Sequence, residues 1–193
     1  AAISKKGFDA VVANNLTGGF LMMREVFVQG MQRAGGAIVN MTADFRNGMP
    51  GMGHSGAARA GMSNLTMSAA VEWAHAGVRV NAVAPGWIAS SGMDTYAGAV
   101  RTLIPRLKQH VPLGRMGLEA EVSAAIVFLL CPAAAFITGV TLQIDGAASL
   151  GSAVFPRLPV QRQAPFEGFH RATTPEVLRE EPADPAPCGE GPR

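Results

Sequence analysis

The feature that most constrains how this chain folds is an alternation of long helical patterns with short runs of β-branched residues. The short runs are five or six residues long and mostly apolar, which is typical of strands buried inside a sheet. In chain order, the expected helices and strands cover residues 9–33, 37–41, 54–76, 78–83, 118–130 and 140–144. Strands that alternate with helices of this length are joined by parallel crossovers, so the sequence predicts a layered α/β domain.

The ends of the expected helices carry residues that favour helix initiation and termination. Asp9 is the expected N-cap of the first helix, and Gly35 with Gly36 is expected to end it. Glu119 and Glu121 stand in the first turn of the last long helix, where negative charge interacts favourably with the helix dipole. These signals predict where the first helix begins and ends and where the last long helix begins.

The sequence divides near residue 155 into two parts of different composition. Residues 1–154 hold the expected helices and strands, whereas Pro recurs and apolar residues thin out over 155–193. We expect a disordered tail there, with a short helix over 175–181, because such a segment buries too little to offset its ordering entropy. Three strands make a small parallel sheet and Ala1 is not a starting methionine, so we also expect further strands to precede this sequence.

Charge and hydropathy patterns argue against several classes of function. The formal net charge is only +2 and the basic residues are scattered, which argues against nucleic-acid binding and against a polybasic membrane anchor. The apolar stretches are interrupted well before they reach a membrane-spanning length. The histidines are dispersed and show no spacing typical of metal ligands. With no signal peptide visible in the sequence, we expect a cytoplasmic location.

Seven short motifs follow one another in the order found in a known enzyme family. They are Asn15–Phe20, Gly35–Thr42, His54–Gly61, Val78–Ile88, Pro112–Gly117, Phe136–Gly139 and Ile144–Ala147. Together they resemble the second half of the short-chain dehydrogenases/reductases. The variant H-S-G-A-A-R-A-G is most similar to the trans-2-enoyl-CoA reductases and the acyclic-terpenoid, citronellol-type dehydrogenases. The resemblance implies the C-terminal part of a Rossmann-like, doubly wound parallel sheet with helices on both faces, without its N-terminal strands.

The catalytic pair of that family is altered in this sequence. In the family, a Tyr and a Lys four residues later lie on one helix face, where the Tyr donates a proton and the Lys lowers its pKa. The matching positions are Ser55 and Arg59, and a serine hydroxyl is a far weaker acid than a phenol. Arg59 keeps the positive charge but does not give up a proton. Ser63 and Met67 occupy a second register in which enoyl reductases of this type show Tyr and Lys.

The altered pair favours one reaction over another. Ketone reduction needs a proton on an oxygen that is becoming an alkoxide. Hydride addition to the C=C bond of an enoyl thioester leaves an enolate, which hydrogen-bond donors stabilise while water protonates the carbon. Enoyl reduction is therefore the chemistry that best tolerates Ser55 and Arg59.

Two further catalytic positions are implied by the resemblance. Asn15 matches the helix asparagine that holds a water in the proton relay of the family, although without the family pattern it is better explained as a helix-packing amide. Thr42 falls near the catalytic serine of the family. The loop is one residue short, so Ala43 competes with Thr42 for that position.

The resemblance also implies cofactor and substrate positions. Pro85, Gly86 and Ile88 match the turn whose backbone meets the nicotinamide amide, and Ser90 stands where a Thr hydrogen-bonds the pyrophosphate. Tyr96 lies in the loop that covers the substrate in relatives, where it either contacts substrate or packs the loop. The glycine-rich phosphate loop of the family matches no segment of this sequence. We therefore expect the nicotinamide half of an NAD or NADP site.

Two functions stay open at this point. The first is an NAD(P)-dependent oxidoreductase acting on a small molecule, either an enoyl thioester such as an enoyl-CoA or a terpenoid or lipid-like substrate. The second is a catalytically inactive member that acts as a folding or subunit-interaction module, because the Tyr, the Lys and the phosphate loop are absent. Apolar residues on more than one face of the helices over 9–33 and 54–76 also predict a homodimer or homotetramer.

Overall fold

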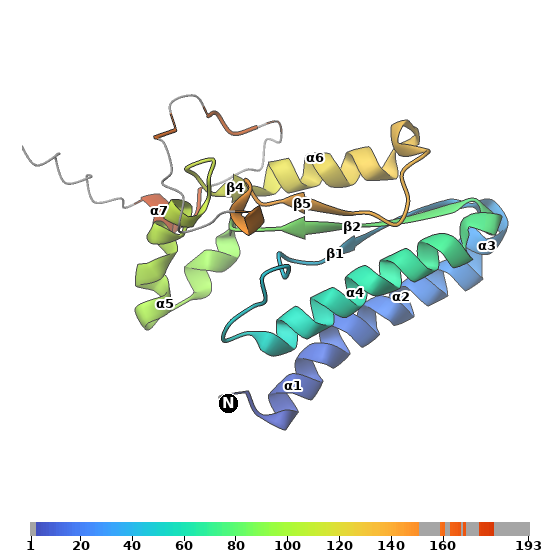
Figure 1. Cartoon of the computed structure of the whole chain (residues 1–193), viewed down its shortest axis with the longest axis horizontal. Helices are drawn as coiled ribbons and strands as arrows, with labels where there is room; N and C mark the ends of the chain where they lie inside the picture. The colour runs from blue at the N-terminus through green and yellow to red at the C-terminus, as the bar shows by residue number, and fades with distance from the viewer. Residues whose placement is uncertain (1–2, 151–158, 161–162, 167, 169–173, 180–193) are drawn as a thin grey trace, which may run out of the picture.

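A parallel three-stranded sheet lies at the centre of the molecule (Figure 1). The computed structural model describes residues 3–150, 159–160, 163–166, 168 and 174–179. The strands are β1 (Gly36–Met41), β2 (Val78–Pro85) and β5 (Thr141–Ile144), in the order β1-β2-β5. Both neighbouring pairs are parallel, with Gly36 opposite Val78 and Pro85 opposite Ile144. The predicted parallel α/β architecture is confirmed.

Helices cover both faces of the sheet, so the domain has three layers. The helix α6 (Glu119–Leu130) lies on one face, while the N-terminal helices and α4 (Gly53–Glu72) lie together on the other (Figure 1). The N-terminal helical run is continuous and contains two π-helical segments. Its parts are α1 (Lys5–Val12), η1 (Ala13–Thr17), α2 (Gly18–Val26), η2 (Phe27–Met31) and α3 (Gln32–Ala34).

The first helix begins one turn earlier than the sequence predicted. Its N-cap is Ser4, whose hydroxyl oxygen accepts a hydrogen bond of 3.1 Å from the backbone N–H of Gly7. Asp9 lies inside the helix and pairs with Lys5 one turn before it. The prediction of Asp9 as N-cap was wrong because the apolar periodicity starts only after the first exposed turn. The predicted end is confirmed, since Gly35 leaves the helix with a φ of 70°.

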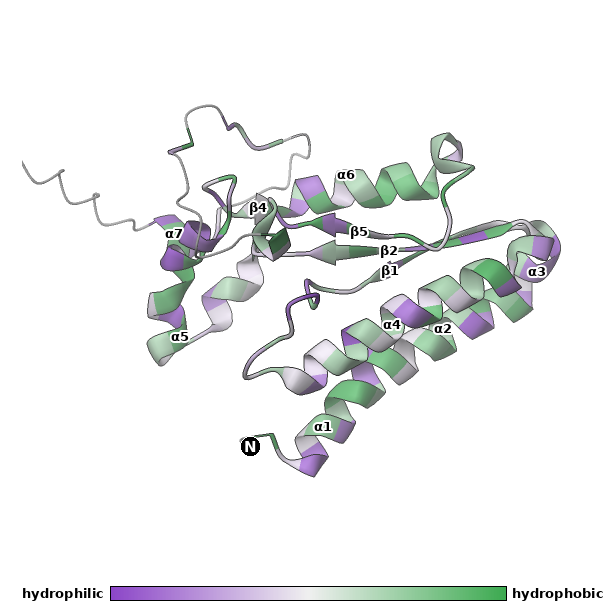
Figure 2. Ribbon diagram, in the orientation of Figure 1, coloured by the Kyte–Doolittle hydropathy of each residue, from purple (hydrophilic) through white to green (hydrophobic). Residues whose placement is uncertain are grey.

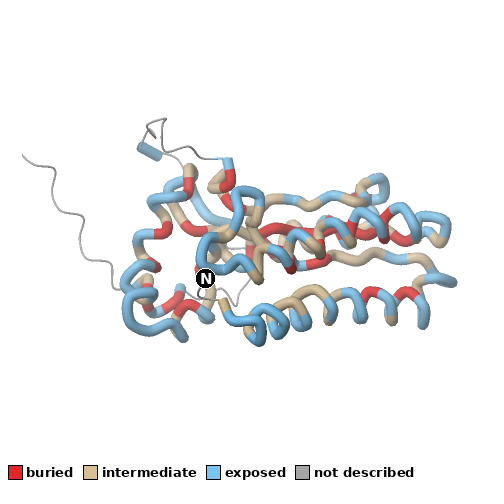
Figure 3. Tube along the Cα trace, turned by 60° about the horizontal axis from the view of Figure 1, so that its bottom comes forward, coloured by how far each residue is buried: buried red, intermediate tan, exposed pale blue. Residues whose placement is uncertain are grey.

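Two apolar clusters hold the layers together, one on each face of the sheet. On the α4 face, Val78 and Val80 are almost fully buried against residues of α2, η2 and α4. On the α6 face, Val83 packs with Val122 and Leu129. Alternate residues of β2 therefore serve opposite faces, as expected for a strand buried on both sides. In Figure 3 the buried positions recur along one side of the long helices rather than around them.

The loops at the carboxyl end of the sheet form a third cluster. A short parallel pair joins β3 (Ile88–Ala89) to β4 (Gly117–Leu118), and the sequence did not predict it. The remaining short elements are η3 (Ala74–Ala76), η4 (Ser91–Thr95), α5 (Gly98–Leu103), η5 (Ile104–His110), η6 (Pro132–Ala134) and η7 (Ala148–Leu150). This third cluster contains residues of β3, η4 and η5 rather than of the sheet.

The last described helix is α7 (Glu176–Arg179), inside the predicted helical range 175–181. Most of the segment 155–193, for which we predicted disorder, lies outside the described residues. Among the described residues, no helix combines the length and the hydropathy that crossing a membrane requires.

Candidate functional site

The candidate site lies where β1 and β2 end and their loops begin. The backbone N–H of Thr42 donates to Val83 O at 2.8 Å, and that of Asp44 donates to Pro85 O at 3.1 Å. These bonds continue the strand pairing into the loops and hold the two chain segments side by side. The carboxyl edge of a parallel sheet is where α/β proteins bind their ligands.

One cavity of about 270 Å³ opens directly at this edge. Its wall consists of Ala43, Asp44, Gly48, Met49, Pro50, Met52, Pro85, Gly86, Trp87 and Ala148. Gly86 donates its N–H to Ile144 O at 3.0 Å, which ties the turn after β2 to the end of β5. A Cβ on Gly86 would lie only 2.7 Å from the Cβ of Asp145, so this close approach requires glycine. The turn therefore offers backbone rather than side chain to the cavity.

A second, larger and more apolar cavity of about 440 Å³ adjoins the first. Its wall consists of Met52, Trp87, Ser90, Gly92, Met93, Tyr96, Val100, Leu103, Ile104 and Leu107. Met52 and Trp87 belong to both walls, so the two cavities share a boundary. An apolar cavity with few polar groups suits a lipid-like chain.

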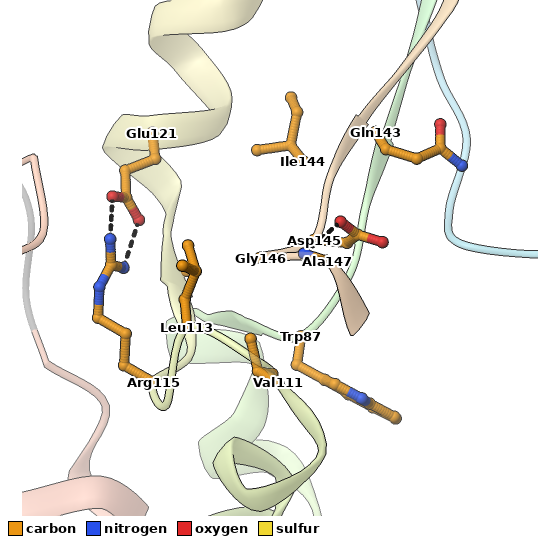
Figure 4. Close-up of a pocket in the computed structure, with 11 residues that line it drawn as sticks. Trp87, Val111, Leu113, Arg115, Glu121, Gln143, Ile144, Asp145, Gly146 and Ala147 are labelled. Carbon is orange, nitrogen blue, oxygen red and sulfur yellow. Dashed lines mark hydrogen bonds and ion pairs between the residues drawn. The ribbon is translucent and has the colours of Figure 1, made fainter. Parts of the chain in front are cut away.

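A third cavity of about 270 Å³ lies beyond Trp87 (Figure 4). Figure 4 shows the Arg115–Glu121 pair on one side and Ile144 with Asp145 on the other. The guanidinium of Arg115 holds both oxygens of Glu121, at 2.8 Å through Nη1 and 2.6 Å through Nη2. This bidentate pair fastens the loop before β4 to the first turn of α6.

Hydrogen bonding strongly stabilises the charged form of Glu121. The hydrogen bonds from Arg115, helped by the backbone N–H groups of Leu118 and Phe166, lower the pKa of Glu121 to about 2 despite the opposing effect of burial. The same contact raises the pKa of Arg115. Glu121 thus places negative charge at the N-terminus of α6, as predicted. It also accepts a hydrogen bond of 2.9 Å from the backbone N–H of Leu118, which has no partner within the helix.

Ser55 and Arg59 lie one turn apart in the first two turns of α4. Arg59 donates through Nη1 to Met41 O, 2.8 Å away at the end of β1. Its Nε is buried and has no hydrogen-bond partner within the described part of the chain. Burial lowers the pKa of Arg59. Neither side chain lines the cavities. Gly56, the residue after Ser55, lies beside the cavity residue Met49, because a Cβ on Gly56 would be 3.3 Å from the Cβ of Met49.

The second register, Ser63 and Met67, lies farther along α4. The hydroxyl of Ser63 makes a 2.6 Å hydrogen bond with that of Thr141, at the start of β5. Thr141 is the first residue of β5, whereas the third cavity borders the last two residues of this strand, Gln143 and Ile144. The geometry therefore favours Ser55 and Arg59 over the second register.

Asn15 and Thr42 both use their side chains within the fold. The Asn15 amide donates to Val11 O at 3.1 Å, inside the π-helical segment η1. The hydroxyl of Thr42 is buried and donates to Val83 O at 2.8 Å. Of the two competing positions after β1, Ala43 lines the first cavity and Thr42 does not. Ala43 carries no proton donor, so neither residue offers a hydroxyl to the cavity.

The structure brings together most of the positions expected around the cofactor and substrate. Pro85 and Gly86 line the first cavity, whereas Ser90 and Tyr96 line the second. Ile88 lines neither cavity and belongs to β3, where it packs against the α6 cluster. Tyr96 is 54% exposed at the rim.

Two residues that line the cavities, Asp44 and Met52, were not predicted from the sequence, and neither was the role of Asp94, the neighbour of the cavity residue Met93. Asp44, the third residue after β1, lines the first cavity, and Met52 lines both cavities. Asp94 binds α7 through two backbone N–H groups. The position of Asp44 after a predicted strand was the one usable signal, whereas the other two depend on contacts between distant segments. No group of three or more His, Cys, Asp or Glu residues that could hold a metal occurs in the described ranges.

The chain is similar to a known family and to several known proteins. Residues 1–149 match the sequence profile of the family described as enoyl-(acyl carrier protein) reductase. The chain is 36% identical over 140 residues to the 3-oxoacyl-(acyl-carrier-protein) reductase FabG of Rickettsia felis, covering 72% of this chain and 57% of that protein. It is 33% identical over 170 residues to a peroxisomal 2,4-dienoyl-CoA reductase of Pongo abelii, and this match covers 87% of this chain and 56% of that protein.

A solved structure is more similar still. The citronellol catabolism dehydrogenase AtuB of Pseudomonas aeruginosa PAO1 is 64% identical, with a TM-score of 0.67, over 77% of this chain and 56% of that one. The chain spans less than two thirds of the length of these relatives. The fold, the cavities at the carboxyl edge and these matches together place the chain in the short-chain dehydrogenase/reductase family.

Proposed function

We propose that the chain forms the substrate-binding and catalytic part of an NAD(P)-dependent oxidoreductase that reduces an enoyl thioester or converts a lipid-like terpenoid. The observation that carries the proposal is the pair of adjoining cavities that share Met52 and Trp87. One is bounded by the backbone turn after β2, and the other by apolar side chains. A hydride carrier and an apolar substrate need this arrangement, because the two reacting carbons must meet at one boundary.

The residues of the first cavity fit the nicotinamide half of a dinucleotide. The small side chain of Pro85 and the backbone of Gly86 leave room for a flat ring, and Arg59 supplies a positive charge at the end of β1, where it donates to Met41 O. A bound nicotinamide would supply or accept the hydride. No segment of the chain offers the glycine-rich phosphate loop, so these residues do not select between NAD and NADP.

Ser55 and Arg59 are the candidate groups for stabilising the oxygen that becomes negative. Arg59 holds a fixed orientation through Met41 O, and its guanidinium keeps a positive charge near the carboxyl edge of the sheet. The Ser55 hydroxyl can donate one hydrogen bond. Such donors stabilise an enolate without transferring a proton, which favours reduction of a C=C bond beside a thioester. The name of the dienoyl-CoA reductase relative supports a thioester, and that of the citronellol dehydrogenase supports a terpenoid.

Fluorescence titration of the full chain with NADH and NADPH tests the proposal. A Trp73→Phe background leaves Trp87, which lines both cavities, as the reporter. We expect saturable quenching of Trp87 fluorescence. Arg59→Met should raise the Kd for the cofactor about tenfold, because it removes a charged donor. The control Arg33→Gln, at the far end of the N-terminal helices, should leave the Kd unchanged. Ser55→Ala should bind the cofactor normally but reduce trans-2-decenoyl-CoA or citronellal more slowly.

Absence of any quenching, from a chain that circular dichroism shows to be folded, would contradict the proposal and favour the non-catalytic alternative. Turnover of citronellal with none of trans-2-decenoyl-CoA would assign the terpenoid substrate, and the reverse would assign the thioester.

The proposal includes self-association in a cytoplasmic setting. Large apolar side chains are exposed in the helical layer on the α4 face of the sheet, among them Met22, Val28 and Val71, and Figure 2 shows hydrophobic residues along both α2 and α4. A second copy is the occupant that we propose for this face, because it would present the same apolar residues to itself. Sedimentation equilibrium that gave only the monomer mass would contradict a dimer or tetramer.

A further inference from the structure

The helix α7 is held against the loops around the apolar cavity by a carboxylate and a buried valine. The two oxygens of Asp94, in η4, accept hydrogen bonds from the backbone N–H groups of Glu176, 3.0 Å, and Val177, 2.9 Å. These bonds, first that of Val177 and then that of Glu176, lower the pKa of Asp94. Arg101 on α5 donates to the backbone oxygen of the same residue, which ties a third element to this contact.

The side chain of Val177 is only 8% exposed and belongs to the cluster beneath the loops. Its neighbours there include Met93 of η4 and Ile104 and Leu107 of η5. A segment more than 60 residues distant in sequence thus contributes a buried apolar side chain to this cluster. Removing it would leave these neighbours without contacts on one side.

The same three neighbours line the apolar cavity. Met93, Ile104 and Leu107 each have atoms in the wall of the 440 Å³ cavity and also belong to the cluster that contains Val177. Val177 itself does not reach the cavity wall. Its contacts can therefore set the positions of wall residues without touching anything inside the cavity.

We propose that α7 supports the wall of the apolar cavity, and that Asp94 and Val177 are positioning residues that determine how long an aliphatic chain the cavity admits. The inference rests on the proposed function only in taking this cavity as the substrate site. A close-packed wall with few alternative conformations discriminates between substrates of different chain length. A wall that can relax admits substrates of several chain lengths.

Hydrogen exchange tests the support. In the full chain, Val177→Ala and Asp94→Asn should each accelerate exchange of the backbone amides over residues 91–110 by about five- to tenfold, because the loops lose packing or an anchor. Val160→Ala is the matched control, since Val160 lies in the same C-terminal segment but contacts Gly114 rather than the cluster. Unchanged exchange over 91–110 in both variants would overturn the proposal.

Binding of straight-chain alcohols tests the consequence for chain length. With Trp87 as reporter, the Kd values of the unsubstituted chain for 1-dodecanol and 1-octanol should differ about tenfold, and Val177→Ala should reduce this ratio to about threefold or less. Faster exchange with an unchanged alcohol preference would overturn the role in chain length. If the unsubstituted chain binds neither alcohol but still binds NADH, the assignment of the cavity to substrate fails, and with it the chain-length role.

Discussion

The sheet core and the cluster beneath the cavity loops are two apolar regions built in different ways. The core takes its residues from long neighbouring elements, and Val78, Val80 and Val83 of β2 have at most 1% exposure. The loop cluster takes its residues from β3, η4, η5, the segment before β4 and α7, with exposures between 3% and 9%. Backbone pairing along three strands fixes the core. The parts of the loop cluster are joined by a strand pair of only two residues, by the hydrogen bonds of Asp94 to α7 and by side-chain packing. The difference separates a rigid scaffold from a cavity whose shape can be adjusted.

The largest expected effect is a loss of folding stability when a leucine is shortened to alanine, and its size should differ between the two regions. Leu129→Ala in the core should lower the free energy of unfolding by about 3–4 kcal/mol, because the packed layers cannot collapse around the cavity. Leu107→Ala in the loop cluster should cost only about 1–2 kcal/mol, since the loops can close around the missing side chain. Urea unfolding followed by circular dichroism measures both.

Leu130→Ala is the control, because the neighbouring Leu130 is 45% exposed and its truncation should change stability by no more than about 0.5 kcal/mol. Equal losses for Leu129→Ala and Leu107→Ala would mean that the loop cluster is as rigid as the core.

A smaller effect is expected at the ion pair that joins the two regions. Glu121→Gln should cost about 2 kcal/mol at neutral pH, because it removes a bidentate, mostly buried ion pair. The folded-state pKa of Glu121, about 2, lies below its unfolded value, so this stabilisation is complete above roughly pH 4.5 and is lost as the pH falls toward 2. Unfolding measured at pH 7 and at pH 3 should therefore show a smaller difference between the two proteins at pH 3.

Glu119→Gln removes a charge from the same helix turn without touching Arg115, and it should leave that pH dependence in place. A Glu121→Gln protein as stable as the unsubstituted chain at pH 7 would show that the pair contributes nothing to joining the loop to α6.

The smallest effect is expected at Thr42, where the sheet passes into the site. Thr42→Val should cost about 1 kcal/mol, because it removes the hydrogen bond from the hydroxyl while the backbone N–H still donates to Val83 O. NADH binding should be unchanged. Thr42→Ser, which keeps the hydroxyl, should recover part of the loss in thermal unfolding. A tenfold weaker Kd for NADH in the Val variant, with unaltered stability, would instead place the hydroxyl at the site.

Most of the scaffold could be predicted because its elements are long and periodic. The three sheet strands and the three long helices were found within a few residues. The helices show apolar residues at helical spacing, and the strands are short β-branched runs between them. The start at Ser4 was missed because the first turn of α1 buries no residue. The pair β3–β4 was missed because two-residue strands, Ile88–Ala89 and Gly117–Leu118, are too short to show a period.

The site was predictable only where it touches the scaffold. Pro85 and Gly86 stand at the end of a recognisable strand and line a cavity, while their contact with a cofactor stays a prediction. Ala43 lines the cavity and Thr42 does not, and such a one-residue difference in a loop depends on backbone geometry that the sequence does not reveal. The contact of Asp94 with α7 joins segments 82 residues apart and leaves no local pattern in the sequence.

A buried hydrogen bond two helical turns from the candidate catalytic residues has a consequence for their alignment. The Asn40 amide of β1 donates to the Thr66 hydroxyl of α4 at 2.8 Å, seven residues after Arg59. A slip of α4 by one residue would turn Arg59 by about 100° and move it about 1.5 Å along the helix axis. That slip would also separate the Asn40 amide from its hydroxyl partner in an apolar layer, whereas the Thr66 hydroxyl would keep its bond to Met62 O. The hydrogen bond of this single amide thus fixes the rotation of α4 relative to β1, and with it the direction in which Ser55 and Arg59 point.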